Sequence, residues 1–233
     1  MRIKIVHVLC EGQTEQGFVE SVLKSYLQNN GVTAVKSVLV TTNKKKNARG
    51  GMISYVQALN DLNILLKSKR NSGTESHIFT TMFDLYALPS DFPGYDESLK
   101  MVEPYAKVDA LESSFAAAVN DCRFIPYIQL HEFEALLFCG IDYISRLYPG
   151  CEKACEKLQM DLKQSKGNPE LINNGLQTAP SKRIIKAVEG NKKVHYNYNK
   201  PSTGKYVTSN IGIDKLRSKC EHFNQWIQKL IEL

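Results

Sequence analysis

Residues 3–15 read IKIVHVLCEGQTE, a short apolar run followed at once by an acid, a glycine and a second acid. The run is rich in Ile and Val and has the length of a buried strand. Glu11 stands where this strand would end, and Glu15 lies one turn into the helix that we expect next, so both carboxylates would face one crevice. The segment therefore predicts an α/β fold with acids at the carboxyl edge of its first strand.

A second apolar run, HIFTTMF at residues 77–83, also ends in an acid, Asp84. Parallel strands bring their carboxyl ends to one edge of a sheet, and hard cations such as Mg²⁺ or Mn²⁺ bind carboxylate oxygens. Glu11, Glu15 and Asp84 are therefore the first candidates for a metal site. The ordinary alternatives are a first-turn acid that favours the helix dipole at Glu15 and a turn former at Asp84.

Three further acids would leave the same edge of the sheet if all strands run parallel. Asp91 follows in the loop beyond Asp84, and Glu132 and Glu134 come just after the fourth expected strand. We therefore take these three as supplementary metal ligands, behind Glu11, Glu15 and Asp84.

In the first 140 residues, segments with the hydrophobic pattern of a strand alternate with segments that have the pattern of an amphipathic helix. The patterns predict strands at residues 3–9, 34–40, 77–83 and 123–129, and helices at 14–30, 53–68 and 102–119. This βαβαβαβ order implies right-handed crossovers and a mostly parallel four-stranded sheet with helices on both faces. Residues 1–140 are thus expected to form the α/β domain.

Residues 141–233 predict a mainly helical, basic extension packed on that domain. Helices are expected at 132–138, 142–147, 152–164, 182–188 and 213–231, with a turn at Gly204. From residue 181 onward the chain has 11 Lys and Arg against 4 Asp and Glu. Such a surplus suits a polyanion such as nucleic acid, although a solvated surface is an equal alternative.

Several common classes are excluded. No apolar stretch is long enough for a membrane span, and the start of the chain lacks the apolar segment of a signal peptide. The six cysteines are scattered without a Cys-x-x-Cys pair, which predicts reduced thiols in a cytoplasmic protein and argues against a zinc site. Motifs of P-loop nucleotidases, dinucleotide-binding folds and α/β hydrolases are missing, and HEFE at 131–134 lacks the second histidine of a zincin.

Longer stretches resemble a known family. The Glu-Gly-x-Thr-Glu turn at residues 11–15 is similar to the opening signature of Toprim domains, especially those of the overcoming-lysogenization-defect (OLD) nucleases. The wider pattern resembles an uncharacterised bacterial Toprim-like family, domain-of-unknown-function family 4276. The matching stretches cover nearly the whole chain and lie at residues 10–15, 82–94, 127–138, 169–173, 178–184 and 220–226.

The resemblance implies a Toprim-like sheet and a Mg²⁺ or Mn²⁺ cofactor held by Glu11 and Asp84. Toprim enzymes carry a second Asp two positions after the first, and this chain has Tyr86 there. Asp91 or Glu134 would have to substitute. OLD-type nucleases also place a basic residue near the metals, a role that Lys182 or Arg183 would fill as a charge aimed at phosphate.

A basic loop at residues 41–51 follows the second expected strand and opens at the same sheet edge. Lys45 and Arg49 in this loop, together with Lys182 and Arg183, are the candidate nucleic-acid-binding residues. The more ordinary interpretation of this loop is a solvated, flexible connection.

The leading hypothesis is a metal-dependent nuclease or related phosphodiester-processing enzyme in bacterial defence, with Glu11, Asp84 and Lys182 as catalytic residues. The alternative is a non-catalytic nucleic-acid-binding or partner subunit that works with an ATPase, which the missing Asp-x-Asp favours. A homodimer and the choice between DNA and RNA stay open.

Overall fold

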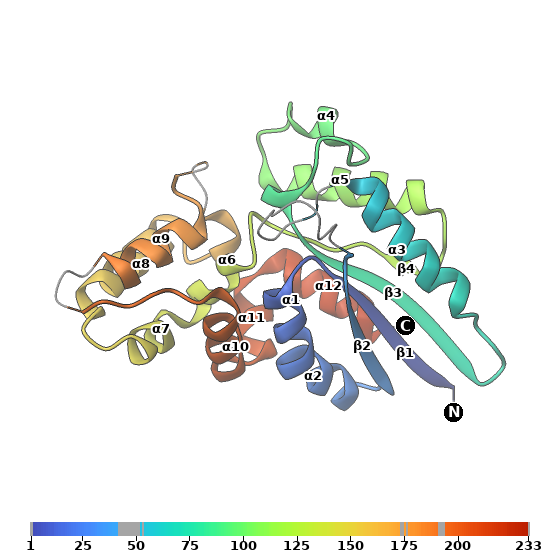
Figure 1. Ribbon diagram of the computed structural model, residues 1–233, viewed down its shortest axis with the longest axis horizontal. Helices are drawn as coiled ribbons and strands as arrows, with labels where there is room; N and C mark the ends of the chain where they lie inside the picture. The colour runs from blue at the N-terminus through green and yellow to red at the C-terminus, as the bar shows by residue number, and fades with distance from the viewer. Residues whose placement is uncertain are drawn as a thin grey trace.

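A computed structural model describes residues 2–41, 52, 54–172, 175, 177–190 and 194–232 of the chain. Figure 1 shows a twisted sheet with helices packed on both sides and a helical region at one end. The strands are β1 (Ile3–Cys10), β2 (Ala34–Leu39), β3 (Glu75–Asp84), β4 (Phe124–Ile125) and β5 (Ile128–Gln129). Their order is β2-β1-β3-β4, with β5 also pairing β3, and every pairing is parallel. The predicted α/β class with a mostly parallel sheet is confirmed.

The fourth expected strand, residues 123–129, is instead two short strands. Pro126 separates β4 from β5, and a proline has no N–H to continue the ladder. The Thr81 hydroxyl bridges the interruption: it accepts a hydrogen bond from Tyr127 N at 2.9 Å and donates one to Tyr127 O at 3.0 Å. The break lets the chain re-pair with β3 further along, so that β5 ends beside Asp84.

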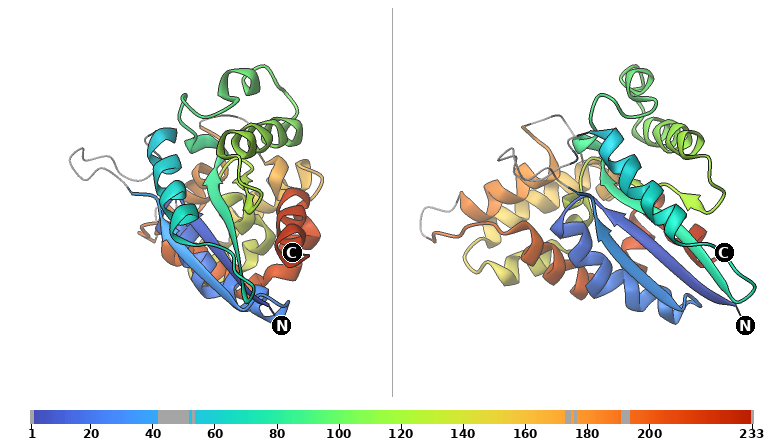
Figure 2. Two further views of the ribbon diagram at one scale, coloured as in Figure 1. Left: turned by 90° about the vertical axis from the view of Figure 1, so that its right-hand side faces the viewer. Right: turned by 45° about the vertical axis from the view of Figure 1, so that its right-hand side comes forward.

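The two faces of the sheet are buried in separate cores. Successive side chains of a strand point to opposite faces, and in β1 Val8 and Cys10 belong to one core while Leu9 belongs to the other. The Leu9 core holds α3 (Tyr55–Ser68) and α5 (Pro104–Val119). The Val8 core holds a continuous helical segment made of α1 (Gln13–Phe18), the π-helical η1 (Val19–Leu23) and α2 (Lys24–Asn29). Figure 2 shows α3 and α5 on one side of the sheet and α1 and α2 on the other.

The segments after β5 are helical, as the sequence predicts. They are α6 (Glu134–Leu137), η3 (Phe138–Gly140), α7 (Ile141–Leu147), α8 (Glu152–Gln164), η4 (Pro169–Leu171), α9 (Pro180–Glu189), α10 (Lys200–Ile211), α11 (Ile213–Lys219) and α12 (Glu221–Ile231). Their apolar residues join the Val8 core, and Trp226 of α12 donates a hydrogen bond to Thr80 of β3 at 2.8 Å. Helices from beyond residue 140 therefore cover one face of the sheet.

The turn predicted at Gly204 is wrong, because Gly204 lies inside α10 and is buried. A Cβ atom there would lie 2.9 Å from Phe133 Cε1 and 3.0 Å from Thr14 Cγ2. Glycine is thus required for the close approach of α10 to α1, not for a bend. The expected helix 213–231 is also interrupted, because Cys220 takes an extended conformation between α11 and α12.

Two short helical elements lie between β3 and α5, η2 (Leu85–Ala87) and α4 (Tyr95–Ser98).

In the part of the chain that the structure describes, no helix combines the length and apolar character needed to cross a membrane.

Candidate functional site

A pocket of about 720 Å³ opens at the carboxyl ends of β1 and β3. Among the described residues that line it are five carboxylates and one lysine, Glu11, Glu15, Asp84, Glu132, Glu134 and Lys200. The first three are the primary metal candidates of the sequence, and two of the supplementary candidates join them. The structure therefore brings together acids that lie up to 123 residues apart in the chain.

Hydrogen bonds hold the acids at the strand ends in place. Glu11 follows β1 directly, and its Oε2 accepts a hydrogen bond of 2.9 Å from the backbone N–H of Asp84 at the end of β3. Asp84 Oδ1 in turn accepts one of 2.8 Å from the backbone N–H of Phe133. The two carboxylates thus connect β1, β3 and the segment after β5, which fixes the geometry of this edge.

Glu15 lies in the first turn of α1 and is 6% exposed. Gly12 precedes this turn, and a Cβ atom there would come within 3.1 Å of Glu15 Oε2. The glycine of the Glu-Gly-x-Thr-Glu segment therefore leaves room for the second carboxylate beside the first.

The two acids after β5 have partners from the helical region. Glu132 accepts hydrogen bonds from the backbone N–H and the hydroxyl of Ser181, at the beginning of α9, the latter at 2.9 Å. Glu134 Oε1 lies 2.8 Å from the Lys200 ammonium at the beginning of α10. The pocket consequently depends on both the sheet and the later helices.

Burial and mutual repulsion weaken the acidity of these carboxyl groups. Burial, followed by the charge of Glu11, raises the pKa of Glu15 to about 7. Burial raises the pKa of Glu134 to about 7 although Lys200 lowers it, and burial also raises the pKa of Glu11. Asp84 is affected most, because burial and the charges of Glu15, Glu11 and its other acidic neighbours raise its pKa well above the ordinary value.

Lys200, in contrast to the acids, is held in its charged form. Its burial favours the neutral amine, but the Glu134 carboxylate outweighs this effect and raises the pKa of the Lys200 ammonium. The pocket therefore contains an excess of negative charge that one ammonium only partly compensates, which is the electrostatic setting of a cation site.

The carboxylates of the pocket do not converge as closely as three direct ligands of one metal ion would. Within the described residues, the only three His, Cys, Asp or Glu side chains with ligand atoms all within 4.8 Å of one another are Asp109, Glu112 and His222, which do not line this pocket. The pocket acids are more widely spaced. Because Mg²⁺ keeps several waters and takes only one or two carboxylates from protein, this spacing suits it.

Other predicted site residues lie elsewhere. Asp91 accepts hydrogen bonds from the Ser54 hydroxyl at 2.9 Å and from Tyr55 N at 3.0 Å, so its carboxylate caps the beginning of α3. Asp91 is not among the residues that line the acidic pocket, whereas Tyr86, two residues after Asp84, is. The loop residues Lys45 and Arg49 lie outside the described residues.

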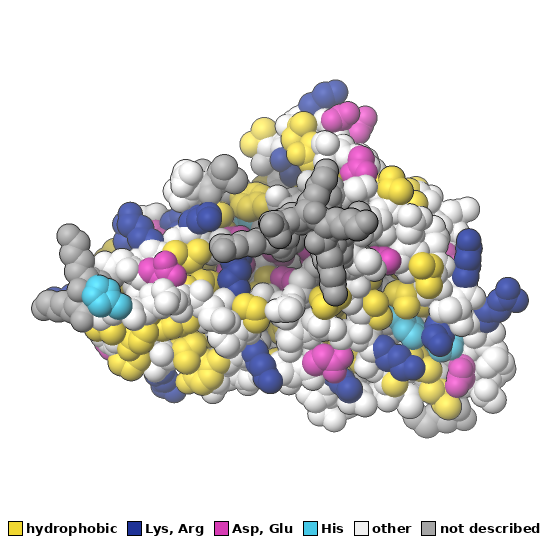
Figure 3. All heavy atoms as spheres, viewed as in Figure 1, with side chains coloured by type: hydrophobic (Ala, Val, Ile, Leu, Met, Phe, Trp, Pro, Cys, Tyr) yellow, Lys and Arg dark blue, Asp and Glu magenta, His cyan; other side chains and the backbone are white. Residues whose placement is uncertain are grey.

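Lys182 and Arg183 lie in α9, at the rim of a separate pocket of about 260 Å³ between α8 and α9. The Arg183 guanidinium makes an ion pair of 2.7 Å with Asp161, and Lys182 is exposed. Figure 3 shows Lys and Arg side chains on the surface of this helical region. The structure therefore places Lys182 on the surface of α9 and Arg183 in an ion pair, and neither lines the acidic pocket.

Lys200 is the site residue that sequence reasoning missed. The local signal was an N-cap pattern, Asn199 followed by Lys200 and Pro201, which marks the beginning of a helix. Asn199 Oδ1 indeed accepts a hydrogen bond from Ser202 N at 3.0 Å. Only the packing of α10 against α1 shows that the lysine reaches the acids.

Comparison with known proteins gives one family match. The profile of a family described as "Domain of unknown function (DUF4276)" matches residues 10–231, nearly the whole chain. Searches of curated proteins and of solved structures returned no match.

Proposed function

The chain belongs to the DUF4276 family, and we propose that its acidic pocket binds Mg²⁺ or Mn²⁺ and cleaves phosphodiester bonds of nucleic acid. The observation that supports this proposal is the convergence of five carboxylates and one lysine at the carboxyl edge of a parallel sheet. Ligand sites of open α/β sheets lie at this edge.

Glu11, Asp84 and Glu15 are the proposed metal ligands. Glu11 and Asp84 lie at the ends of β1 and β3, and Glu15 lies in the first turn of α1. Burial raises the pKa of all three, so a divalent cation would relieve their repulsion. A bound metal ion would neutralise charge on phosphate oxygens and lower the pKa of an attacking water. Glu134 is our candidate for the role that the second Asp has in Toprim domains, since Tyr86 stands at that position.

Lys200 is the proposed phosphate-binding residue. Its side chain is 45% exposed, and the ammonium lines the pocket beside Glu134. An ammonium on a flexible stem can turn from a carboxylate to a phosphate without rearrangement of the backbone. Lys182, which the sequence suggested for this role, lies on the α9 surface and would contact nucleic acid further from the scissile bond.

Metal binding is the first test. We would titrate Mn²⁺ into the wild type, Glu11→Gln and Asp84→Asn by calorimetry, and then assay cleavage of DNA and RNA. Both substitutions nearly preserve side-chain shape, and each keeps the oxygen that accepts a backbone hydrogen bond. We expect micromolar binding that both variants weaken; equal binding in all three proteins would refute the metal site.

A matched control is Glu97→Gln, which changes an exposed acid of α4. This variant should bind Mn²⁺ and cleave nucleic acid like the wild type. If it loses activity together with the pocket variants, the effect is one of general charge and not of the pocket.

A second candidate function is that of a non-catalytic subunit. Two of the five acids already have partners from the later helices, Glu134 with Lys200 and Glu132 with Ser181, which favours this alternative. Such a subunit would bind nucleic acid or work beside an ATPase in the cytoplasm, alone or as a homodimer. Metal binding without cleavage of any nucleic acid would support it.

A further inference from the structure

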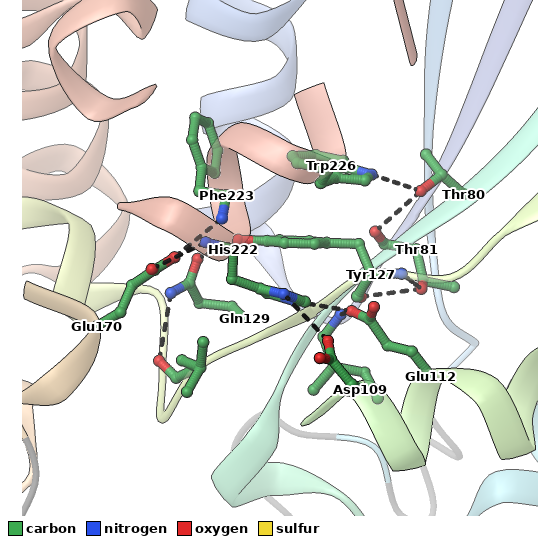
Figure 4. Close-up of polar contacts among 12 residues, drawn as sticks. Thr80, Thr81, Asp109, Glu112, Tyr127, Gln129, Glu170, His222, Phe223 and Trp226 are labelled. Carbon is green, nitrogen blue, oxygen red and sulfur yellow. Dashed lines mark hydrogen bonds and ion pairs between the residues drawn. The ribbon is translucent and has the colours of Figure 1, made fainter. Parts of the chain in front are cut away.

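A second set of metal-ligating side chains lies between α5 and α12. Asp109 and Glu112 are three residues apart on α5, so they project from the same side of that helix, and His222 is in the first turn of α12. One ligand atom from each lies within 4.8 Å of the other two, the closest such grouping in the described part of the chain. Figure 4 shows both carboxylates directed at the imidazole ring.

The distances between these atoms are those of a compact site. His222 Nε2 is 2.9 Å from Glu112 Oε1, whereas Asp109 Oδ1 is 3.9 Å from the other ring nitrogen, Nδ1. A metal ion would bind through only one of these nitrogens. Zinc bonds of about 2.0–2.2 Å to nitrogen and oxygen put neighbouring ligand atoms roughly 3–3.5 Å apart. The carboxylate that faces the other nitrogen would therefore have to turn toward the ion, and one ligand atom from each residue already lies within 4.8 Å of the other two.

Neighbouring groups fix the orientation of the two buried ligands. The backbone N–H of His222 donates to Glu170 Oε2 at 3.0 Å, and the ring stacks on Tyr127 with centroids 5.2 Å apart. Glu112 Oε1 accepts a hydrogen bond of 2.7 Å from Ile128 N. Such outer contacts are the ones that preorganise metal ligands and tune their affinity.

The site is open to solvent on one side. Asp109 and Glu112 line a pocket of about 380 Å³ together with Gln225, which follows His222 by three residues on α12. The Asp109 side chain is 64% exposed. A metal ion can therefore enter, and water or the Gln225 amide oxygen can complete its coordination.

We propose that Asp109, Glu112 and His222 bind a divalent transition metal of the Zn²⁺ type, which joins α5 to α12. An imidazole nitrogen among carboxylates favours such a metal over Mg²⁺, whereas the acidic pocket offers only carboxylate oxygens. The sequence argument against zinc rested on the cysteines and does not bear on these ligands. The metal would clamp the helix that covers one sheet face to the helix on the other.

Without a metal, the same three groups can form an ion pair around a protonated histidine. Burial works against the imidazolium, but the hydrogen bond and charge of Glu112 outweigh it and raise the pKa of His222. Zinc would have to displace this proton, as metals generally do at histidine. The experiment must therefore separate a metal clamp from a salt bridge.

We would titrate Zn²⁺ by calorimetry in an excess of Mg²⁺, which on the proposed function would occupy the acidic pocket, and record thermal unfolding with and without Zn²⁺. The wild type should bind one Zn²⁺ and unfold at a higher temperature when it is present. Asp109→Asn and His222→Gln should each bind at least about ten-fold more weakly. Asp96→Asn, at an exposed acid of α4, should behave like the wild type.

Glu11→Gln should retain Zn²⁺ binding, so this proposal and that for the acidic pocket can fail separately. If His222→Gln does not fold, the Zn²⁺ affinity of Asp109→Asn still tests the proposal, because Asp109 is exposed and has little structural role. Absence of Zn²⁺ binding in the wild type would overturn the proposal and leave a salt bridge. Equal affinities of wild type and Asp109→Asn would also overturn it.

Discussion

The Lys200 ammonium lies 2.8 Å from the Glu134 carboxylate, where it is the one lysine among five acids that line the pocket in the described part of the chain. The acids come from the first 134 residues, and the lysine comes from a helix that begins at residue 200. This contact joins the sheet edge to the helical region and sets the charge balance of the proposed site.

Replacement of Lys200 by Met should strengthen metal binding and weaken catalysis. The ammonium competes with a cation for Glu134, and a half-exposed ion pair contributes about 0–1 kcal/mol, so Mn²⁺ affinity should rise by no more than about five-fold. Loss of the proposed phosphate contact should lower kcat by about a hundred-fold. Calorimetry and a cleavage assay measure the two effects. Lys205→Met, at an exposed position of α10, is the control and should change neither.

Glu15→Gln should gain stability relative to the wild type as the pH rises. The pKa of Glu15 is raised from 4.5 to about 7, so between these values the native protein holds a proton that the unfolded chain has released. The free energy of unfolding contributed by Glu15 therefore falls through this window, by up to ~1.4 kcal/mol per pH unit, and is level above pH 7. Urea unfolding at pH 5, 6, 7 and 8 in a chelator tests this.

The comparison with Glu15→Gln is needed because other groups act in the opposite direction. Burial lowers the pKa values of His7 and His131 to about 4, so their contribution to stability rises with pH. These contributions cancel when the free energy of unfolding of the variant is subtracted from that of the wild type at each pH. A stability difference that does not change between pH 5 and 7 would contradict the raised pKa of Glu15.

Two glycine-to-alanine substitutions in helices should have opposite effects. Alanine favours a helix interior over glycine by about 1 kcal/mol, and Gly17 of α1 has no atom within 4 Å of an added Cβ, so Gly17→Ala should stabilise the protein. Gly204→Ala would push against Phe133 and Thr14 and should destabilise it by about 1–3 kcal/mol. Urea unfolding measures both; a stabilised Gly204→Ala would show that α10 and α1 are not so closely packed.

Substitution of Asp91 by Ala tests whether Asp91 is a metal ligand or a helix cap. Because the Asp91 carboxylate accepts hydrogen bonds at the beginning of α3, we expect a loss of about 1 kcal/mol in unfolding free energy. Mn²⁺ affinity should be unchanged, since Asp91 does not line the acidic pocket. A clear loss of Mn²⁺ binding would restore Asp91 to the metal site that the sequence suggested.

The sequence was sufficient to predict the sheet and the acids at its carboxyl edge. Strand period, helix period and their alternation are local signals, and the parallel arrangement follows from their order. Glu11 and Asp84 could be placed together because register in a parallel sheet aligns strand ends. Pro126 was also visible, yet its effect depends on how the chain re-pairs with β3.

The residues that were misplaced depend on contacts between distant segments. Gly204 resembles a turn former until α10 is seen against α1, and with that helix unrecognised Lys200 could not be directed at Glu134. Asp91 follows Asp84 by seven residues, but the intervening turns carry it to the beginning of α3. His222 meets Glu112 across 110 residues, a pairing for which no local pattern exists.

The late position of α10 has a consequence for synthesis on the ribosome. Chains grow from the N-terminus, and N-terminal parts fold first. All five acids leave the ribosome before Lys200 and Ser181, their partners in the later helices. A nascent chain of about 140 residues would therefore carry an unbalanced negative cavity and an uncovered sheet face, and it would depend on protons, cations or chaperones until the last helices arrive.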